Sequence, residues 1–212
     1  MRKISWTLLY LAVLPIAAVS QKTEVGIMAG AALANVHLKY GGASVSAESK
    51  LGATAGVFLD MPFSKQASFR PGLNFVQKGS RTSEPGYKDK LTLNYIEIPL
   101  DLVFKPTMQN IQLFIGMGPS IAFAVSGKEK ETDNGNVYTY KYKFGNNPDE
   151  HDMKRLDIGW NFLLGMEMKK GFITCLNYNL GLTDVSPGSS SEGSVKNRYF
   201  GFKVGYIVKS KK

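Results

Sequence analysis

The sequence predicts an all-β fold, an eight-stranded antiparallel up-and-down transmembrane β-barrel, from three observations. Apolar residues alternate with small or polar residues in eight separate segments, which is the periodicity of β-strands. Short and long connections alternate between these segments, as they do in outer-membrane barrels. Nowhere after residue 20 do about 18 apolar residues follow one another, so a membrane-spanning segment must be a strand.

Residues 1–20 are predicted to be a signal peptide rather than part of the fold. Arg2 and Lys3 precede a mostly apolar run, and Ala18-Val19-Ser20 offers the small residues that a signal peptidase reads. An uncleaved membrane anchor is the less favoured alternative, because the run is short for a spanning helix and contains Pro15. We therefore expect export, cleavage before Gln21 and a barrel domain over residues 21–212.

Eight period-2 segments make up the predicted barrel, and an even number suits a single-chain bacterial barrel. They are Val25 to Leu33, Leu51 to Met61, Phe69 to Gln77, Leu91 to Phe104, and the segments that begin at Ile111, Arg155, Phe172 and Phe200. Pro71, Pro99 and Pro119 fall inside these strands. Each proline requires a bulge or a missing ladder bond, since a closed barrel has no edge strand.

The two faces of these strands favour a membrane barrel over a soluble sandwich or a lipocalin-like exported carrier. One face is apolar and almost free of charge, as contact with lipid requires. The other is rich in Gly, Ala, Ser and Asn and carries single charges of both signs, which suits a narrow lumen filled by paired side chains. The predicted lumenal charge network consists of Glu24, Arg70, Lys78, Glu97, Asp101, Asp157, Glu167 and Lys203. Such a lumen is too narrow for passive diffusion of solutes.

Aromatic residues near the predicted strand ends are candidates for interfacial girdles, namely Tyr95, Phe104, Tyr178 and Tyr199. The longest connection, 127–154, contains a hairpin-turn signal at Asp133-Asn134-Gly135-Asn136. The segment after this turn either extends the preceding strand above the membrane or forms a contact site for glycan, protein or lipopolysaccharide. The candidate contact residues are Tyr138, Tyr140, Lys141, Tyr142 and Lys143.

The charge balance and the residue types exclude several function classes. The net charge is +9, but the basic residues are scattered, so outer-membrane lipid and lipopolysaccharide are better partners than nucleic acid. Cys175 is the only cysteine, and we expect it to be a packing residue.

A barrel hydrolase acting on lipid A or peptides is the enzymatic alternative, and it needs a histidine near Ser, Asp or Glu. His37 and His151 are the only histidines, and both lie in long predicted loops. The acidic run around His151 is a weak cation site at best, and a charge network is favoured over an acid pair for Glu97 and Asp101. We expect no catalytic site, metal site or cofactor, and a non-catalytic role as envelope scaffold, surface binder or secretion and assembly accessory.

The segment Asn94-Tyr95-Ile96-Glu97-Ile98-Pro99-Leu100 resembles the hallmark strand of the PorT-like family of small outer-membrane β-barrels of Bacteroidota. Further similar pieces follow in family order, at Gly116 to Pro119, Asp157 to Gly159, Gly165 to Glu167, Gly181 to Asp184 and Asn197 to Phe200. The resemblance implies that a proline is tolerated at position 99. It also implies envelope or secretion proteins as partners, because the founding member is linked to a secretion system.

Overall fold

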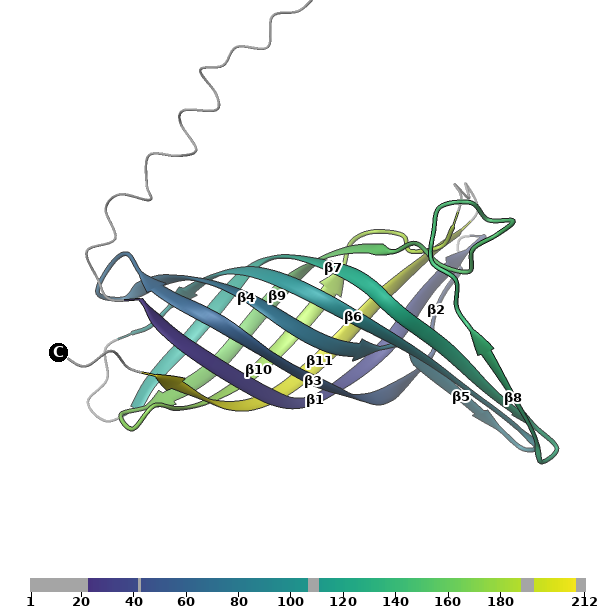
Figure 1. Cartoon of the computed structure of the whole chain (residues 1–212), viewed down its shortest axis with the longest axis horizontal. Helices are drawn as coiled ribbons and strands as arrows, with labels where there is room; N and C mark the ends of the chain where they lie inside the picture. Colours follow the sequence, from purple (N-terminus) through teal and green to yellow (C-terminus); the bar gives the residue numbers. More distant parts are fainter. Residues whose placement is uncertain (1–22, 42, 107–110, 188–192, 209–212) are drawn as a thin grey trace, which may run out of the picture.

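Eight antiparallel strands form a closed ring in the computed structural model, which describes residues 23–41, 43–106, 111–187 and 193–208. They are β1 (Glu24–Tyr40), β3 (Glu48–Pro62), β4 (Ala67–Lys78), β6 (Tyr87–Phe104), β7 (Ile111–Asp133), β9 (Leu156–Met168), β10 (Phe172–Gly181) and β11 (Gly193–Val208). Each pairs with its neighbours in the chain, and β1 pairs with both β3 and β11, which closes the ring. The predicted fold class is confirmed (Figure 1). The predicted signal peptide lies outside the described residues.

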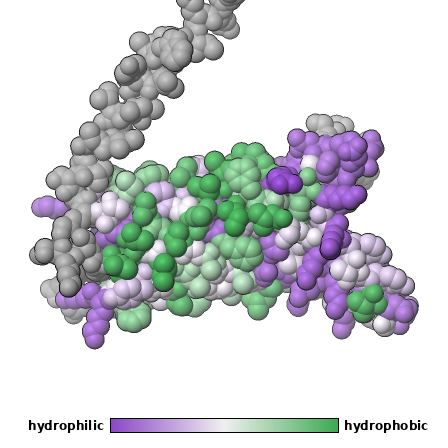
Figure 2. All heavy atoms as spheres, in the orientation of Figure 1, coloured by the Kyte–Doolittle hydropathy of each residue, from purple (hydrophilic) through white to green (hydrophobic). Residues whose placement is uncertain are grey.

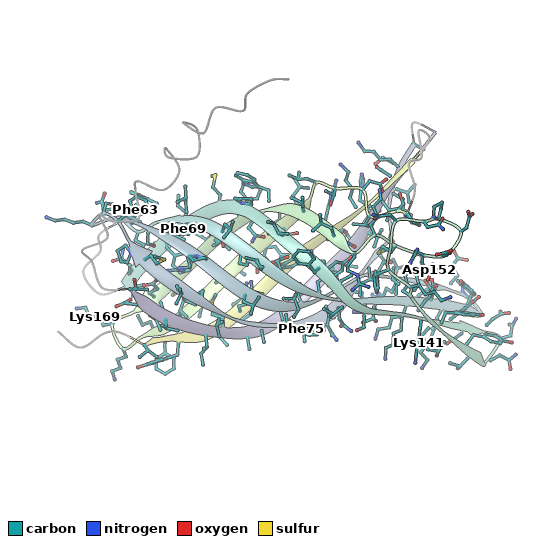
Figure 3. All side chains as sticks on the ribbon, turned by 45° about the horizontal axis from the view of Figure 1, so that its top comes forward. Phe63, Phe69, Phe75, Lys141, Asp152 and Lys169 are labelled. Atoms are coloured by element: carbon teal, nitrogen blue, oxygen red, sulfur yellow. The ribbon has the colours of Figure 1, made fainter. Side chains whose placement is uncertain are left out.

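Three short strands extend the sheet at one end of the ring. They are β2 (Ala43–Ser46), β5 (Ser80–Glu84) and β8 (Asn136–Lys141). The opposite end carries the short connections, such as 63–66 and 169–171. Figure 3 shows Phe63 and Lys169 at this short-turn end, and Lys141 and Asp152 at the other. In outer-membrane barrels the short turns are periplasmic and the longer loops extracellular, so we refer to the extended end as the extracellular end.

The strands alternate as predicted between a lipid-facing and a lumenal side. Residues such as Leu102, Phe104, Ile115 and Leu164 are exposed on the outside, and Figure 2 shows an apolar belt between two polar ends. The intervening residues point inward and are buried. In the described part of the chain, no helix is long and apolar enough to cross a membrane.

The aromatic girdle prediction is wrong for two of its four residues. Tyr95 and Tyr199 are 0% and 2% exposed inside the lumen, whereas Phe104 and Tyr178 face outward. The physical reason is strand alternation, which places Tyr95 on the side of Glu97, and Tyr199 on the side of Lys203.

The in-strand prolines are accommodated by gaps in the ladder without a change of register. Pairing of β3 with β4 is interrupted between Phe58↔Gly72 and Met61↔Phe69, the stretch that contains Pro71. Pairing of β4 with β6 is interrupted opposite Pro99, and that of β6 with β7 opposite Pro119. Each proline is paired on its other side. Because proline has no N–H to donate, the ladder pairing is missing at each of these positions, and no extra residue is inserted as a bulge.

Candidate functional site

A lower cluster of charges fills the periplasmic part of the lumen. It consists of Asp60, Arg70, Lys105 and Glu167. The Arg70 guanidinium donates hydrogen bonds to Asp60 and, at 2.6 Å, to Glu167. Lys105 contacts the same two carboxylates, at 3.1 Å in the case of Glu167. The Arg70 guanidinium also lies 4.8 Å from the ring centre of Phe58 and 4.7 Å from that of Phe114. Two cations thus share two buried carboxylates, and the arginine of the pair lies beside two aromatic rings.

An upper cluster lies nearer the extracellular mouth. It consists of Lys78, Glu97, Asp157, Tyr95, Tyr199 and Asn197. Lys78 Nζ is 3.0 Å from Asp157 and 3.4 Å from Glu97. The Tyr199 hydroxyl donates to Glu97 at 2.6 Å, and the Asn197 amide donates to Asp157 at 3.0 Å. The Lys78 ammonium, 1% exposed, is therefore held by two carboxylates that have further hydrogen-bond donors of their own.

The other predicted lumenal charges lie between and below these clusters. Asp101 and Lys203 are buried and line the same small cavity at mid-lumen, and the positive charge of Lys203 acts on Asp101. Glu24 is half-buried at the start of β1, opposite Asp60 in the register. The mid-lumen cavity has a volume of about 20 Å³, enough for about one water molecule.

A cap of apolar side chains covers the extracellular mouth. Met153 and Val185, which are 5% and 0% exposed, belong to one hydrophobic cluster with Leu93 and Tyr95. Phe144, which follows β8, is partly buried and packs on this cluster. Backbone hydrogen bonds fix the cap, including those from Lys154 N to Val185 O and from Val185 N to Val195 O.

Beyond the mouth, β5, β6, β7 and β8 continue as a four-stranded sheet with two different faces. The tyrosine face carries Tyr87, Asp89, Glu129, Glu131, Tyr138, Tyr140 and Tyr142, and the basic face carries Arg81, Lys88, Lys90, Lys128, Lys130 and Lys141. The register sets Tyr138 opposite Glu131 and Tyr140 opposite Glu129. It sets Lys130 opposite both Lys90 and Thr139. Alternation along each strand produces this separation.

The residues of the candidate contact hairpin are therefore divided between two surfaces. The turn itself forms as predicted, with positive φ at Asn134 (47°) and Gly135 (90°). Tyr138 and Tyr140 are about half exposed, at 49% and 51%. Tyr142 bends toward the mouth, where burial and the charge of Glu129 raise the pKa of its hydroxyl well above the ordinary value. It is therefore a neutral donor to Glu129.

A groove of about 610 Å³ separates β8 from the loop 148–152. Tyr140, Tyr142 and Glu129 line one side, and Asp149 to Asp152 line the other. Lys143, just past β8, holds the loop in place, because its backbone N–H donates to Asp152 at 2.8 Å.

Neither histidine has a carboxylate among the contacts described for it. His37 Nε2 lies 2.9 Å from Ser44 Oγ, and its Nδ1 lies 3.0 Å from Ser46 Oγ. Partial desolvation and the charges of Arg198, Lys39 and Lys196 lower the pKa of His37. His151 contacts the Asn147 carbonyl. Among the described residues, no group of three or more His, Cys, Asp or Glu is arranged to hold a metal ion.

Sequence reasoning did not include several lumenal residues in the network. Asp60 lies on the predicted lumenal face of its strand, so alternation was a usable signal. Lys105 follows the end of β6 and carries no periodic signal. Asn161 and Asn179 are joined at 2.6 Å, and Asn179 also donates to Ser120 at 2.8 Å.

The chain is similar to a family model and to several solved structures. The family model described as outer membrane protein beta-barrel domain matches residues 19–186. No curated protein sequence matches the chain. Among solved structures, Ail, the attachment invasion locus protein of Yersinia pestis, is 14% identical with a TM-score of 0.46, and the alignment covers 89% of this chain and 100% of Ail. The outer membrane protein OprG of Pseudomonas aeruginosa is 12% identical with a TM-score of 0.44, and the shares covered are 90% and 98%. Neisserial surface protein A is 12% identical with a TM-score of 0.43, and the shares covered are 88% and 99%. Because the family model matches most of its residues, the chain belongs to the outer membrane protein β-barrel domain family and resides in the outer membrane.

Proposed function

We propose that the protein is a non-catalytic surface-binding barrel, whose wall supports an extracellular sheet that contacts a partner. The observation that carries this proposal is the tyrosine face of the β5–β8 sheet. Tyr138 and Tyr140 are half exposed there, beside the groove of about 610 Å³. Exposed tyrosines next to a concavity are typical of binding surfaces, because they supply contact area at low entropic cost.

The interior of the barrel supports a role as a rigid support rather than as a passage. Ion pairs fill the lumen at two levels, and apolar side chains cover the mouth. Residues that are held by buried partners cannot also bind a solute without losing those partners. We therefore place the function on the extracellular surface.

The PorT-like resemblance supports partners in the envelope, including secretion proteins, without selecting one. The motif that carries it serves the barrel itself in this chain. Tyr95 and Glu97 belong to the upper cluster, Asn94 donates to Ser126 at 2.8 Å, and Pro99 lies at a ladder gap. A strand used in this way is compatible with many different partners.

A photo-crosslinking residue at position 140 tests the proposal in cells that express the full chain. We expect adducts with protein or glycan from Tyr140, and only lipid adducts from the same residue at Tyr206, which faces lipid. The substitutions Tyr138→Ala and Tyr140→Ala are expected to remove partner retention while the heat-modifiable band of the folded barrel persists. Lipid adducts alone at both positions would contradict the proposal.

Hydrolysis is the second candidate function, favoured by the contact of His37 Nε2 with Ser44 Oγ at 2.9 Å. The His37→Gln and His151→Gln variants separate it from surface binding. Unchanged turnover of lipid A or peptide by the double variant removes this candidate, whereas a loss of turnover with intact partner binding establishes it.

A further inference from the structure

The basic face of the β5–β8 sheet concentrates charge in a way that the fold itself does not require. Its six cations, defined above, alternate with hydroxyl side chains such as Thr132 and Thr139. Lys90 lies directly opposite Arg81 on one side and Lys130 on the other. Lys128 lies directly opposite Lys141. Like charges in direct cross-strand pairs are destabilising, so this arrangement opposes folding of the sheet.

Nearby carboxylates do little to neutralise this face. Glu48 pairs with Arg81 at 3.3 Å, but both side chains are more than half exposed, which makes the pair weak. The acids of the same strands, Asp89, Glu129 and Glu131, occupy the tyrosine face instead. The positive charges of Lys90 and Lys128 also act electrostatically on Lys50, which is buried at the end of the barrel wall. A surface with this charge is suited to an anionic ligand.

The basic face continues the lipid-facing side of the barrel, not its interior. Val125 is exposed to lipid, and Asn94 donates to Ser126 on the outer side of the wall. Gly127 is turned the other way, toward Phe144 and Leu93. Lys128 and Lys130 therefore alternate back to the outer side.

The height of the basic face above the apolar belt matches a layer of lipid headgroups. Lys128 follows Val125 by three residues, roughly 10 Å along a strand at ~3.3 Å per residue. Because the strands are tilted, the height of Lys128 above Val125 along the membrane normal is smaller than this distance. The headgroup layer is about 5–8 Å thick on each side of a bilayer, and sugar-linked phosphates extend it outward. A groove of about 320 Å³ lies at the edge of this face, lined by Arg81, Lys88, Lys90 and Lys130 together with Asp89, which alternation assigns to the tyrosine face.

We propose that the basic face binds the phosphate groups of the phosphorylated glycolipid in the outer leaflet around the barrel. Ammonium groups and hydroxyls at strand spacing contact phosphate oxygens, and the bound phosphates relieve the repulsion between Lys90, Lys130 and Arg81. Barrel and lipid are then held together at the level where the apolar belt ends. The proposal is independent of the surface-binding function, which uses the opposite face of the sheet.

Binding of lipid A to the purified full chain in detergent tests this proposal. The basic-face variant combines Lys90→Gln, Lys128→Gln and Lys130→Gln. The matched control combines Lys65→Gln, Lys169→Gln and Lys170→Gln at the short-turn end, so that it loses the same charge. We expect bisphosphorylated lipid A to bind the basic-face variant about tenfold more weakly than the wild type, as for the loss of three exposed ion pairs. The control is expected to bind like the wild type, and dephosphorylated lipid A is expected to bind all three proteins equally weakly.

Two results would overturn the proposal. One is equal affinity of the basic-face variant and the wild type for bisphosphorylated lipid A, with both proteins folded by heat modifiability. The other is full competition by inositol hexakisphosphate at the same concentration, which would assign the face to a soluble polyanion. Loss of crosslinking at Tyr140 has no bearing on either result, so failure of the surface-binding function is recognised separately.

Discussion

Lysines in the lumen and lysines in the extracellular sheet have opposite surroundings. Lys78 lies in the lumen between Glu97 and Asp157, and its carboxylate partners are hydrogen-bonded in turn. Lys90 lies in the sheet between two cations, Arg81 and Lys130. The chain therefore pairs its charges where pairing stabilises the barrel, and segregates them where the fold does not depend on them. The paired charges of the lumen stabilise the barrel, and the segregated charges of the extracellular sheet are available for binding.

The largest effect is expected from Arg70→Met, which removes the central cation of the lower cluster. Asp60 and Glu167, which are buried, would keep only Lys105 as a cationic partner. We expect a loss of about 3–5 kcal/mol in the free energy of unfolding, measured by urea titration in phospholipid vesicles. Lys170→Met, at an exposed turn, is the control. A loss below about 1 kcal/mol would show that the lower cluster relaxes without its arginine.

Lys78→Met is expected to have the next largest effect, a loss of about 2–3 kcal/mol. The loss is smaller than at Arg70 because Tyr199 and Asn197 still donate to Glu97 and Asp157. The same urea titration measures it. The triple variant Lys78→Met, Glu97→Gln and Asp157→Asn is expected to recover part of the loss, since no buried charge then remains unpaired. No recovery would mean that packing, rather than charge, limits this level of the lumen.

A smaller, pH-dependent effect is expected at the cap. Burial raises the pKa of Asp184, but hydrogen bonds from Ser186 and Val195 outweigh it and lower the pKa below its ordinary value. Its stabilising contribution is thus fully present above the ordinary pKa of about 4 and is lost as the pH falls through the lowered value. We expect Asp184→Asn to lower the hydrogen-exchange protection of residues 182–186 at pH 7, measured as protection factors, and to make that protection insensitive to acid. Asp149→Asn, in the exposed loop, should leave it unchanged.

The smallest effect is expected to have the opposite sign. Lys90→Thr removes the residue between Arg81 and Lys130, and in detergent without glycolipid we expect a gain of about 0.2–1 kcal/mol. The urea midpoint measures this gain, and Lys143→Thr provides the comparison outside the basic face. A loss of stability on Lys90→Thr would show that Lys90 stabilises the fold as the lumenal lysines do, and would contradict the contrast between lumen and sheet.

Much of the barrel could be predicted from the sequence, because alternation alone assigns each strand residue to lipid or lumen. That rule places Arg70, Lys78 and Glu97 inside. The specific partners could not be predicted, since Arg70 and Glu167 are 97 residues apart and meet only when the ring closes in one register. Tyr95 and Tyr199 were misassigned because aromatic residues were expected at interfaces, although their strand parity already placed them inside.

The extracellular region was harder to predict for a different reason. Alternation in β8 separates Tyr138 and Tyr140 from Lys141, and this could be read from the sequence. The basic face, however, arises from the pairing of four strands, two of which lie in stretches that had been assigned to loops. The cap depends on Met153 and Val185, which lie in irregular segments without a periodic signal.

The ladder gaps at the three prolines make polar groups in the lumen important for the backbone as well as for the ion pairs. Pro71, Pro99 and Pro119 leave the carbonyls of Leu59, Gly72 and Leu100 without the amide donor of a regular rung. Hydrocarbon offers no substitute, so these groups need hydrogen-bond donors from the inner side of the wall. The cavity with room for one water molecule is lined by Gly72, Pro99, Arg70 and Asn74 at this level. An apolar repacking of the lumen would therefore remove the polar side chains beside Gly72 and Pro99 as well as the ion pairs.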